Sequence, residues 1–158
     1  MKKLLLFLPI ILILTACGAK PASIQKNFKA EASCVYNDIK IKADVISENH
    51  IITIIMKKPD NLKGYTFRYK GSKLTVTYKN LKLKAEKDYL PASAFPSIIN
   101  NVLDAVNHDG INYSGSYKNK AEYKGKSESG EFIFTSDYNT GFIKNIKLRK
   151  LGFSADFK

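Results

Sequence analysis

The side chains with the most versatile chemistry are scarce in this chain of 158 residues. His50 and His108 each lie in a polar stretch typical of a solvated turn, and neither has a partner at a catalytic spacing. Cys34 falls on the apolar side of a predicted strand, where a thiol is a structural residue rather than a nucleophile. Asp104 and Asp109 are separate carboxylates with no further catalytic group nearby in the sequence. We therefore expect no enzymatic activity.

Metal-ligating patterns are equally weak. The segment 137–141, Asp-Tyr-Asn-Thr-Gly, lacks the ligand spacing and the closing glutamate of a calcium loop. Asparagine and glycine in such a stretch are typical of an ordinary turn. The sequence contains no cluster of cysteines and histidines at zinc-binding spacing. The sequence thus predicts neither a metal site nor a cofactor.

The first residues of the chain are typical of a targeting segment. Met1-Lys2-Lys3 is a short basic head, and an apolar run with a proline in its middle follows over residues 4–14. A head and run of this kind are typical of a secretory signal. Crossing the ~30 Å hydrocarbon core of a bilayer needs about 20 apolar residues, so this run is too short for a permanent span. The sequence predicts export.

The next four residues suggest a covalent modification. Leu14-Thr15-Ala16-Cys17 resembles the lipobox of bacterial prolipoproteins, in which a cysteine follows two small residues and an aliphatic one. The resemblance implies cleavage of residues 1–16 and acylation of the Cys17 thiol at the new N-terminus. Two or three acyl chains, at about 0.8 kcal/mol per buried methylene, attach a protein stably to a membrane. We expect a lipid-anchored protein on the outer face of the cell membrane.

The charge balance is strongly basic. Lysine and arginine number 26 against 14 acids, so the net charge is +12, or +10 once Lys2 and Lys3 leave with the signal. Cations interleaved with aromatic residues between 65 and 79 could suit nucleic acid, but an exported protein meets little of it. A cation close to an anionic bilayer surface contributes about 1 kcal/mol. We expect contact with anionic lipid or a wall polymer, and no nucleic acid.

From Phe28 onward, apolar and polar residues alternate with the period of half-buried strands. A polar tether over residues 17–27 is expected to precede a single domain, residues 28–158. The continuous apolar run 51–56 predicts a central strand covered on both faces. A polar, lysine-rich segment follows residue 117 and extends to Gly130. The alternation predicts further strands near residues 28–36, 39–45, 65–69, 74–78, 111–117, 132–134, 142–148 and 153–157.

One predicted helix interrupts these strands. Ser93 is a candidate N-cap, Pro96 suits the first helical turn, and residues 107–110 end the helix. A helix with one apolar face must cover the apolar face of the sheet, so this order predicts a mainly β (α+β) fold. We expect a curved antiparallel sheet packed on one amphipathic helix. The apolar stripe of about three turns consists of Phe95, Ile98, Ile99, Val102, Leu103 and Val106.

Several turns and core positions together resemble a known superfamily. Residues 59–67 read Pro-x-x-Leu-x-Gly-x-x-Phe, residues 74–78 read Leu-x-Val-x-Tyr, and Tyr-Leu-Pro at 89–91 precedes the helix. Residues 130–143 add Gly-x-Phe and then Asp-x-x-Thr-Gly-x-Ile. These patterns resemble small lipoproteins of Gram-positive, clostridial-type bacteria in the LolA/LolB-like superfamily. The resemblance implies an unclosed β-barrel with a helical lid over an apolar concavity.

Two functions follow from the resemblance. In the first, the concavity between sheet and helix holds a lipid, an acyl chain or another apolar ligand; in a filled core the same side chains would only pack. In the second, the protein is a tethered chaperone or partner of an envelope protein, as spore-germination lipoproteins of the superfamily imply, and docks it on the sheet or an edge strand. The candidate ligand-lining residues are Phe67, Tyr69, Val76, Tyr78, Ile98 and Val102.

Overall fold

The computed structural model describes residues 20–158, and the first part of this range is an antiparallel meander. Its tight turns contain residues with positive φ, such as Asn37 and Asp38 (φ 46° and 66°), a conformation that asparagine and aspartate tolerate. The short 3-10 segment η1 (Asp60–Leu62) connects the third and fourth strands. The strands are β1 (Phe28–Tyr36), β2 (Ile39–Glu48), β3 (Ile51–Lys58), β4 (Thr66–Lys70), β5 (Lys73–Tyr78) and β6 (Leu81–Glu86).

A helix and a second meander complete the domain. The 3-10 segment η2 (Lys87–Tyr89) leads from β6 into the helix α2 (Phe95–Asn107). A third 3-10 segment, η3 (Arg149–Leu151), separates the last two strands. The second meander consists of β7 (Ile111–Tyr117), β8 (Lys120–Ser127), β9 (Gly130–Asp137), β10 (Ile143–Leu148) and β11 (Phe153–Phe157).

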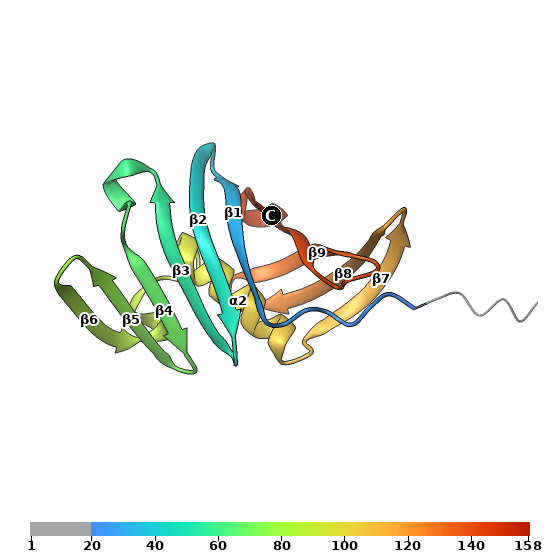
Figure 1. The fold of residues 1–158 in the computed structure, drawn as a ribbon, viewed down its shortest axis with the longest axis horizontal. Helices are drawn as coiled ribbons and strands as arrows, with labels where there is room; N and C mark the ends of the chain where they lie inside the picture. The colour runs from blue at the N-terminus through green and yellow to red at the C-terminus, as the bar shows by residue number, and fades with distance from the viewer. Residues whose placement is uncertain (1–19) are drawn as a thin grey trace, which may run out of the picture.

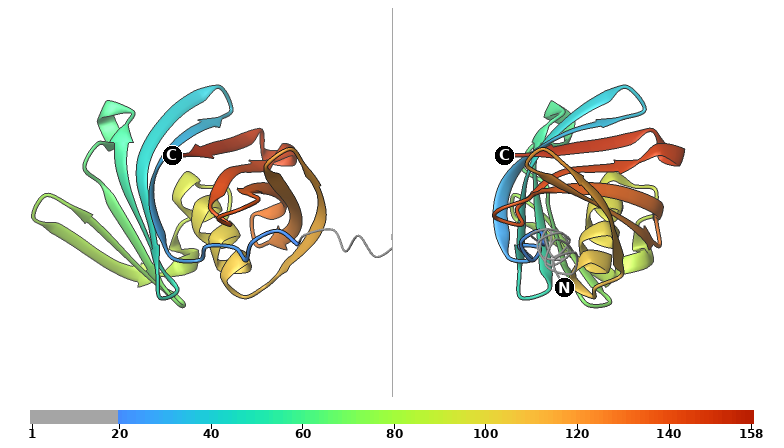
Figure 2. Two further views of the ribbon diagram at one scale, coloured as in Figure 1. Left: turned by 45° about the vertical axis from the view of Figure 1, so that its right-hand side comes forward. Right: turned by 90° about the vertical axis from the view of Figure 1, so that its right-hand side faces the viewer.

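Pairing of β1 with β11 joins the two meanders into one sheet. Within the described range, the order is β6-β5-β4-β3-β2-β1-β11-β10-β9-β8-β7, so eleven antiparallel strands have β6 and β7 as edges (Figure 1). These edges do not pair with each other, and the sheet curves around α2 without closing (Figure 2). The predicted architecture of a curved, unclosed antiparallel sheet on one helix is confirmed. Within residues 20–158, no helix has the length and apolar character needed to cross a bilayer.

The core lies between the concave face of the sheet and α2. All six residues of the predicted apolar stripe are buried, and the helix packs against β8 and β3. Phe132 and Phe134 of β9 fill the space on one side, and Ile52 and Ile54 of β3 fill it on the other. Burying a large aliphatic or aromatic side chain contributes about 1.5–3 kcal/mol, so this contact holds the two halves of the sheet around the helix.

One strand prediction was wrong, and one strand was not predicted. The run 51–56 is not covered on both faces, because only Ile52, Ile54 and Met56 are buried while the alternate residues are half-buried on the outer face. The lysine-rich stretch before Gly130 is the regular strand β8, whose lysines face outward while Ala121 and Tyr123 point into the core. Lysines on one face hid the strand, since two inward residues were too few to show the alternation.

The start of the helix also differs from the prediction. Ala94, not Ser93, occupies the N-cap position, and no side chain caps the helix there. The Ser93 carbonyl instead accepts a hydrogen bond from the Tyr36 hydroxyl at 2.9 Å. Pro96 does lie in the first turn, where its missing N–H is not needed. The contact with Tyr36 attaches the beginning of α2 to the end of β1.

The segment 20–27, within the predicted tether, packs along the domain. The Ala22 amide donates to the Tyr138 carbonyl at 2.9 Å, and the Gln25 amide donates to the Gly141 carbonyl at 3.0 Å. Gly141 (φ +72°) has no room for a side chain, since a Cβ would lie 1.9 Å from the Ser23 carbonyl oxygen. We call residues 20–27 the docked segment. Further along it, Lys26 donates to the Asn107 carbonyl (2.9 Å) and pairs with Asp109 (2.7 Å) at the end of α2.

Candidate functional site

Four of the six candidate ligand-lining residues lie inside the packed core, Phe67 at its margin and three others at its centre. Tyr69 of β4 is 2% exposed, and Ile98 and Val102 of α2 are fully buried. The Tyr69 hydroxyl lies 3.4 Å from Ser97 Oγ of the helix, and burial raises the pKa of this tyrosine. Sheet and helix are therefore in direct contact at this point, and these three side chains fill the space between them.

Phe67 lies on β4 with Tyr69, and the remaining candidates Val76 and Tyr78 lie one strand closer to the β6 edge, on the same face of the sheet. Phe67 is buried and pairs with Val76, which in turn pairs with Leu83. Tyr78 pairs with Leu81 one row away. Figure 2 shows that β5 and β6 extend beyond the helix, so α2 does not cover this part of the concave face. We call Phe67, Val76, Tyr78, Leu81 and Leu83 the apolar strip.

Exposure increases across the apolar strip towards the edge of the sheet. Val76 and Tyr78 are half-buried, Leu83 is 44% exposed and Leu81 is 73% exposed. The Tyr65 ring stacks on the Tyr78 ring, with centroids 4.2 Å apart and planes 8° apart, and forms an aromatic wall at one end. Because large apolar side chains gain free energy when they leave water, such a strip is suited to hold an apolar partner.

Sequence reasoning missed the two leucines of β6. Residues 81–86 read Leu-Lys-Leu-Lys-Ala-Glu, a regular alternation that predicts a strand by the same rule used elsewhere. The lysines at 82 and 84 face away from α2, so the leucines share the concave face with Val76 and Tyr78. The signal was present in the sequence but was short and polar overall.

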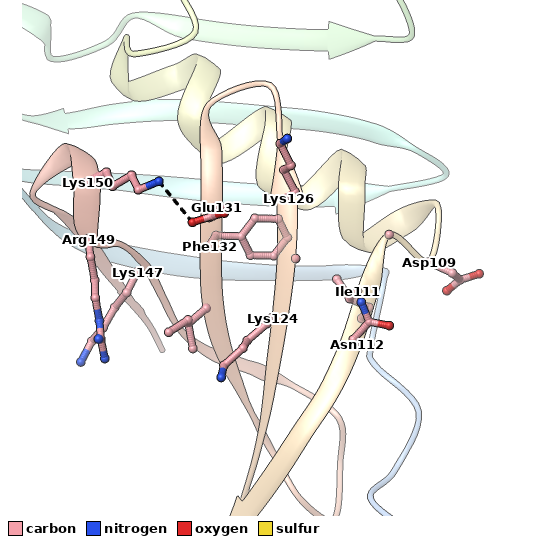
Figure 3. A pocket seen from close by; sticks show the side chains of 13 residues that line it. Asp109, Ile111, Asn112, Lys124, Lys126, Glu131, Phe132, Lys147, Arg149 and Lys150 are labelled. Atoms are coloured by element: carbon pink, nitrogen blue, oxygen red, sulfur yellow. Dashed lines mark ion pairs between the residues drawn. The ribbon is translucent and has the colours of Figure 1, made fainter.

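A second region of interest is a pocket of about 780 Å³ at the other end of the sheet. It is lined by residues from the start of β7, from β8 and β9, from the end of β10 and from η3 (Figure 3). Two acids line it: Glu131 pairs with Lys150 at 3.4 Å, and Asp109 pairs with Lys26 of the docked segment at 2.7 Å. None of the six candidate residues lines this pocket. We call it the cationic pocket after Lys124, Lys126, Lys147, Arg149 and Lys150.

A glycine allows two strands and the connection from α2 to β7 to approach closely at this pocket. Gly125 of β8 lies beneath the ring of Phe132, and a Cβ at this position would be 2.4 Å from the ring. The same Cβ would be 2.9 Å from the Gly110 carbonyl oxygen, where the chain leaves α2 for β7. Any larger residue would push these elements apart, so Gly125 determines the local shape of the pocket.

Cys34 is buried (3% exposed) on the apolar face of β1, as the alternation predicted. Burial, and to a lesser extent the charge of Asp156, raises the pKa of the thiol to about 12. A thiol with such a pKa stays protonated at neutral pH and is a poor nucleophile. Cys17 and the predicted signal 1–16 lie outside the described residues.

The structure brings the two histidines together, although they are far apart in the sequence. The rings of His50, in the turn after β2, and His108, at the end of α2, have centroids 5.5 Å apart. His108 Nδ1 lies 2.9 Å from the Asp104 carbonyl oxygen and 3.5 Å from a carboxylate oxygen of the same residue. Within residues 20–158, no group of three His, Cys, Asp or Glu side chains could hold a metal ion.

No protein-family model and no curated protein matches the chain by sequence. Among solved structures, the fold is similar to that of a LolA superfamily protein from Nitrosomonas europaea. The similarity has a TM-score of 0.41 and 8% sequence identity, and it covers 82% of this chain and 82% of the other. The turn and core patterns of the sequence resemble the same superfamily. A similarity of this size concerns the path of the chain and says nothing about a ligand or a partner.

Proposed function

We propose that this chain is a clostridial-type bacterial lipoprotein, anchored through Cys17 on the outer face of the cell membrane, that holds an apolar ligand such as an acyl chain. The observation that carries the proposal is the apolar strip. Leu81 and Leu83 are exposed on the concave face, beside side chains that continue into the core. An acyl chain on this strip would lose water contact at about 0.8 kcal/mol per buried methylene.

The docked segment supports a close approach of the domain to the membrane. If the mature chain begins at Cys17, only residues 17–19 lie between the lipid and the docked segment, a reach of roughly 10 Å. The docked segment begins beside Tyr138, next to the turns that join β7 to β8 and β9 to β10. This end of the sheet would then face the bilayer. Labelled palmitate should be incorporated in the host by the natural chain and not by a Cys17→Ser variant.

Ligand binding can be tested on protein purified from its host. Native mass spectrometry should show co-purifying lipid, and the protein should take up a fluorescent fatty acid. Leu81→Asp with Leu83→Asp should abolish both, because two charges on the strip oppose an apolar chain. Val35→Asp with Ile39→Asp is the matched control, since both residues are exposed apolar side chains outside the strip. Absence of lipid together with no uptake would reject the proposal.

One observation favours a second candidate function, the binding of an envelope protein. β6 is an edge strand that pairs only with β5 in the described range, so half of its backbone groups are available to an added strand. Crosslinking from a photoreactive residue at Lys84 in intact cells should then trap one dominant protein. A dominant crosslink combined with no bound lipid would favour this function over the first.

A further inference from the structure

The lysines of the cationic pocket are placed by strand register on the outer face of the sheet. Lys124 of β8 and Lys147 of β10 are both direct cross-strand neighbours of Ile133 of β9. Directly paired residues have Cβ atoms about 4.5–5.5 Å apart, so two cations flank one half-buried apolar side chain. Asn112 of β7 pairs with Lys124 and extends the same row.

Most of the positive charge of this pocket has no acidic partner. Lys150 pairs with Glu131, whereas Lys124, Lys126, Lys147 and Arg149 make no ion pair within residues 20–158. Figure 3 shows the charged ends of Lys124, Lys147 and Arg149 pointing to the same side of the sheet. Like charges held together repel one another, and an anion among them would relieve that repulsion.

On another part of the outer face, two acidic side chains of the same sheet neutralise a lysine. Lys57 of β3 lies 2.6 Å from Asp44 and 3.1 Å from Glu31, and its hydrogen bonds to Asp44 and then to Glu31 raise its pKa. The cationic pocket instead combines five cations with two acids, and both acids are already paired, Glu131 with Lys150 and Asp109 with Lys26. A concave, uncompensated cluster is suited to an external anion.

We propose that the cationic pocket binds a segment of a phosphodiester-linked polymer. Arginine and lysine form charge-assisted hydrogen bonds with phosphate, and arginine does so in a bidentate fashion. A volume of about 780 Å³ is within the range of sites for organic ligands, so the ligand is larger than one phosphate ion. Ile133 and Asn112 provide contacts for the groups that lie between phosphates.

The position of the pocket argues against a lipid headgroup as the source of the phosphate. Strand β8 begins at Lys120, at the end of the sheet where the docked segment starts. Lys124 lies four residues further along β8, about 13 Å from Lys120. The polar layer of a bilayer is roughly 5–8 Å thick. The choice of source rests on the proposed anchoring at Cys17, whereas the phosphate chemistry does not.

The test uses the mature lipoprotein in micelles of a non-ionic detergent, with tripolyphosphate and long-chain polyphosphate as probes in calorimetric titrations. Lys147→Gln with Arg149→Gln should weaken binding at least about tenfold, because two charge-assisted contacts are lost. Lys82→Gln with Lys84→Gln changes the net charge equally on exposed lysines of β6 and should change binding less than about twofold. Binding should also weaken with salt.

Three outcomes would overturn the proposal. Equal losses in the two double variants would mean that binding follows net charge and not the pocket. No measurable binding of either probe by the natural protein would remove the site altogether. Binding to phosphatidylglycerol vesicles that depends on Lys147 and Arg149, without binding to polyphosphate, would assign the pocket to a headgroup. Loss of palmitate labelling at Cys17 would reject the anchoring alone and leave the phosphate result intact.

Discussion

The concave face of the sheet has two parts with similar residues and different exposure to solvent. Near the middle, Tyr69 lies against α2 and is almost completely buried. Towards the β6 edge, Val76, Leu81 and Leu83 have no helix above them and become steadily more exposed. The residue types are alike, and coverage by α2 makes the difference. An apolar face becomes a core where another element packs on it, and where none does it stays exposed and is suited to a partner.

Substitutions in the covered part should have the largest effect on stability. Ile98→Ala removes a fully buried side chain between helix and sheet and should cost about 2–5 kcal/mol of unfolding free energy. Leu83→Ala, on the uncovered part, should change it by less than about 0.5 kcal/mol. Urea denaturation of both variants measures the contrast. Similar losses in the two variants would mean that the apolar strip is part of the core.

The buried thiol of Cys34 should make the stability of the core depend on pH. The unfolded thiol ionises near its ordinary value of 9.0, whereas the folded thiol has a pKa of about 12. Between these values the unfolded state has lost a proton that the folded state keeps, so the stabilising contribution present below pH 9 is lost as pH rises. The unfolding free energy should fall by up to about 1.4 kcal/mol per pH unit in this window. A Cys34→Ala variant should lack this part of the slope.

Substitutions in the uncovered part should change the affinity for an apolar ligand and leave the stability of the fold almost unchanged. Leu83→Ala removes exposed methylene groups from the apolar strip and should weaken uptake of a fluorescent fatty acid about tenfold. Val35→Ala is the control, because Val35 is similarly exposed on the outer face. Titration of the fatty acid into each purified variant gives the affinities. Unchanged affinity in Leu83→Ala would locate the ligand elsewhere.

The smallest expected effect concerns the docked segment, where a substitution in the neighbouring turn should change only the local rate of hydrogen exchange. Asp137 accepts hydrogen bonds from the Asn139 and Thr140 amides and shapes the turn beside this segment. The hydrogen bond from the Thr140 amide is the largest cause of the lowered pKa of Asp137. The stabilisation that the ionised carboxylate gives the turn is therefore lost as pH falls through that lowered pKa. Asp137→Ala should speed hydrogen exchange at the Ala22 and Gln25 amides. Asp88→Ala, in an exposed 3-10 turn, should leave both rates unchanged.

Most local features of this fold could be predicted because they depend on periodicity. Alternation placed Cys34 inside and predicted most of the strands, and a 3.6-residue period predicted the apolar stripe of α2. The exceptions are segments with little apolar signal. In β8 the outward lysines outnumber the inward residues, and in β6 the leucines are exposed at the edge. Low burial alone does not explain these omissions, because the predicted strand β7 has no buried residue whereas β8 buries Ala121 and Tyr123.

The candidate sites depended on contacts that periodicity does not contain. The amino-acid sequence alone specifies which residues are apolar, which alternate and where the helix has its stripe. The three-dimensional fold is needed to show that α2 covers Tyr69 but not Leu83, and that Lys124 and Lys147 flank Ile133. The physical reason is that strand order and helix placement bring together residues far apart in the chain. Their burial and charge depend on those neighbours and not on local pattern.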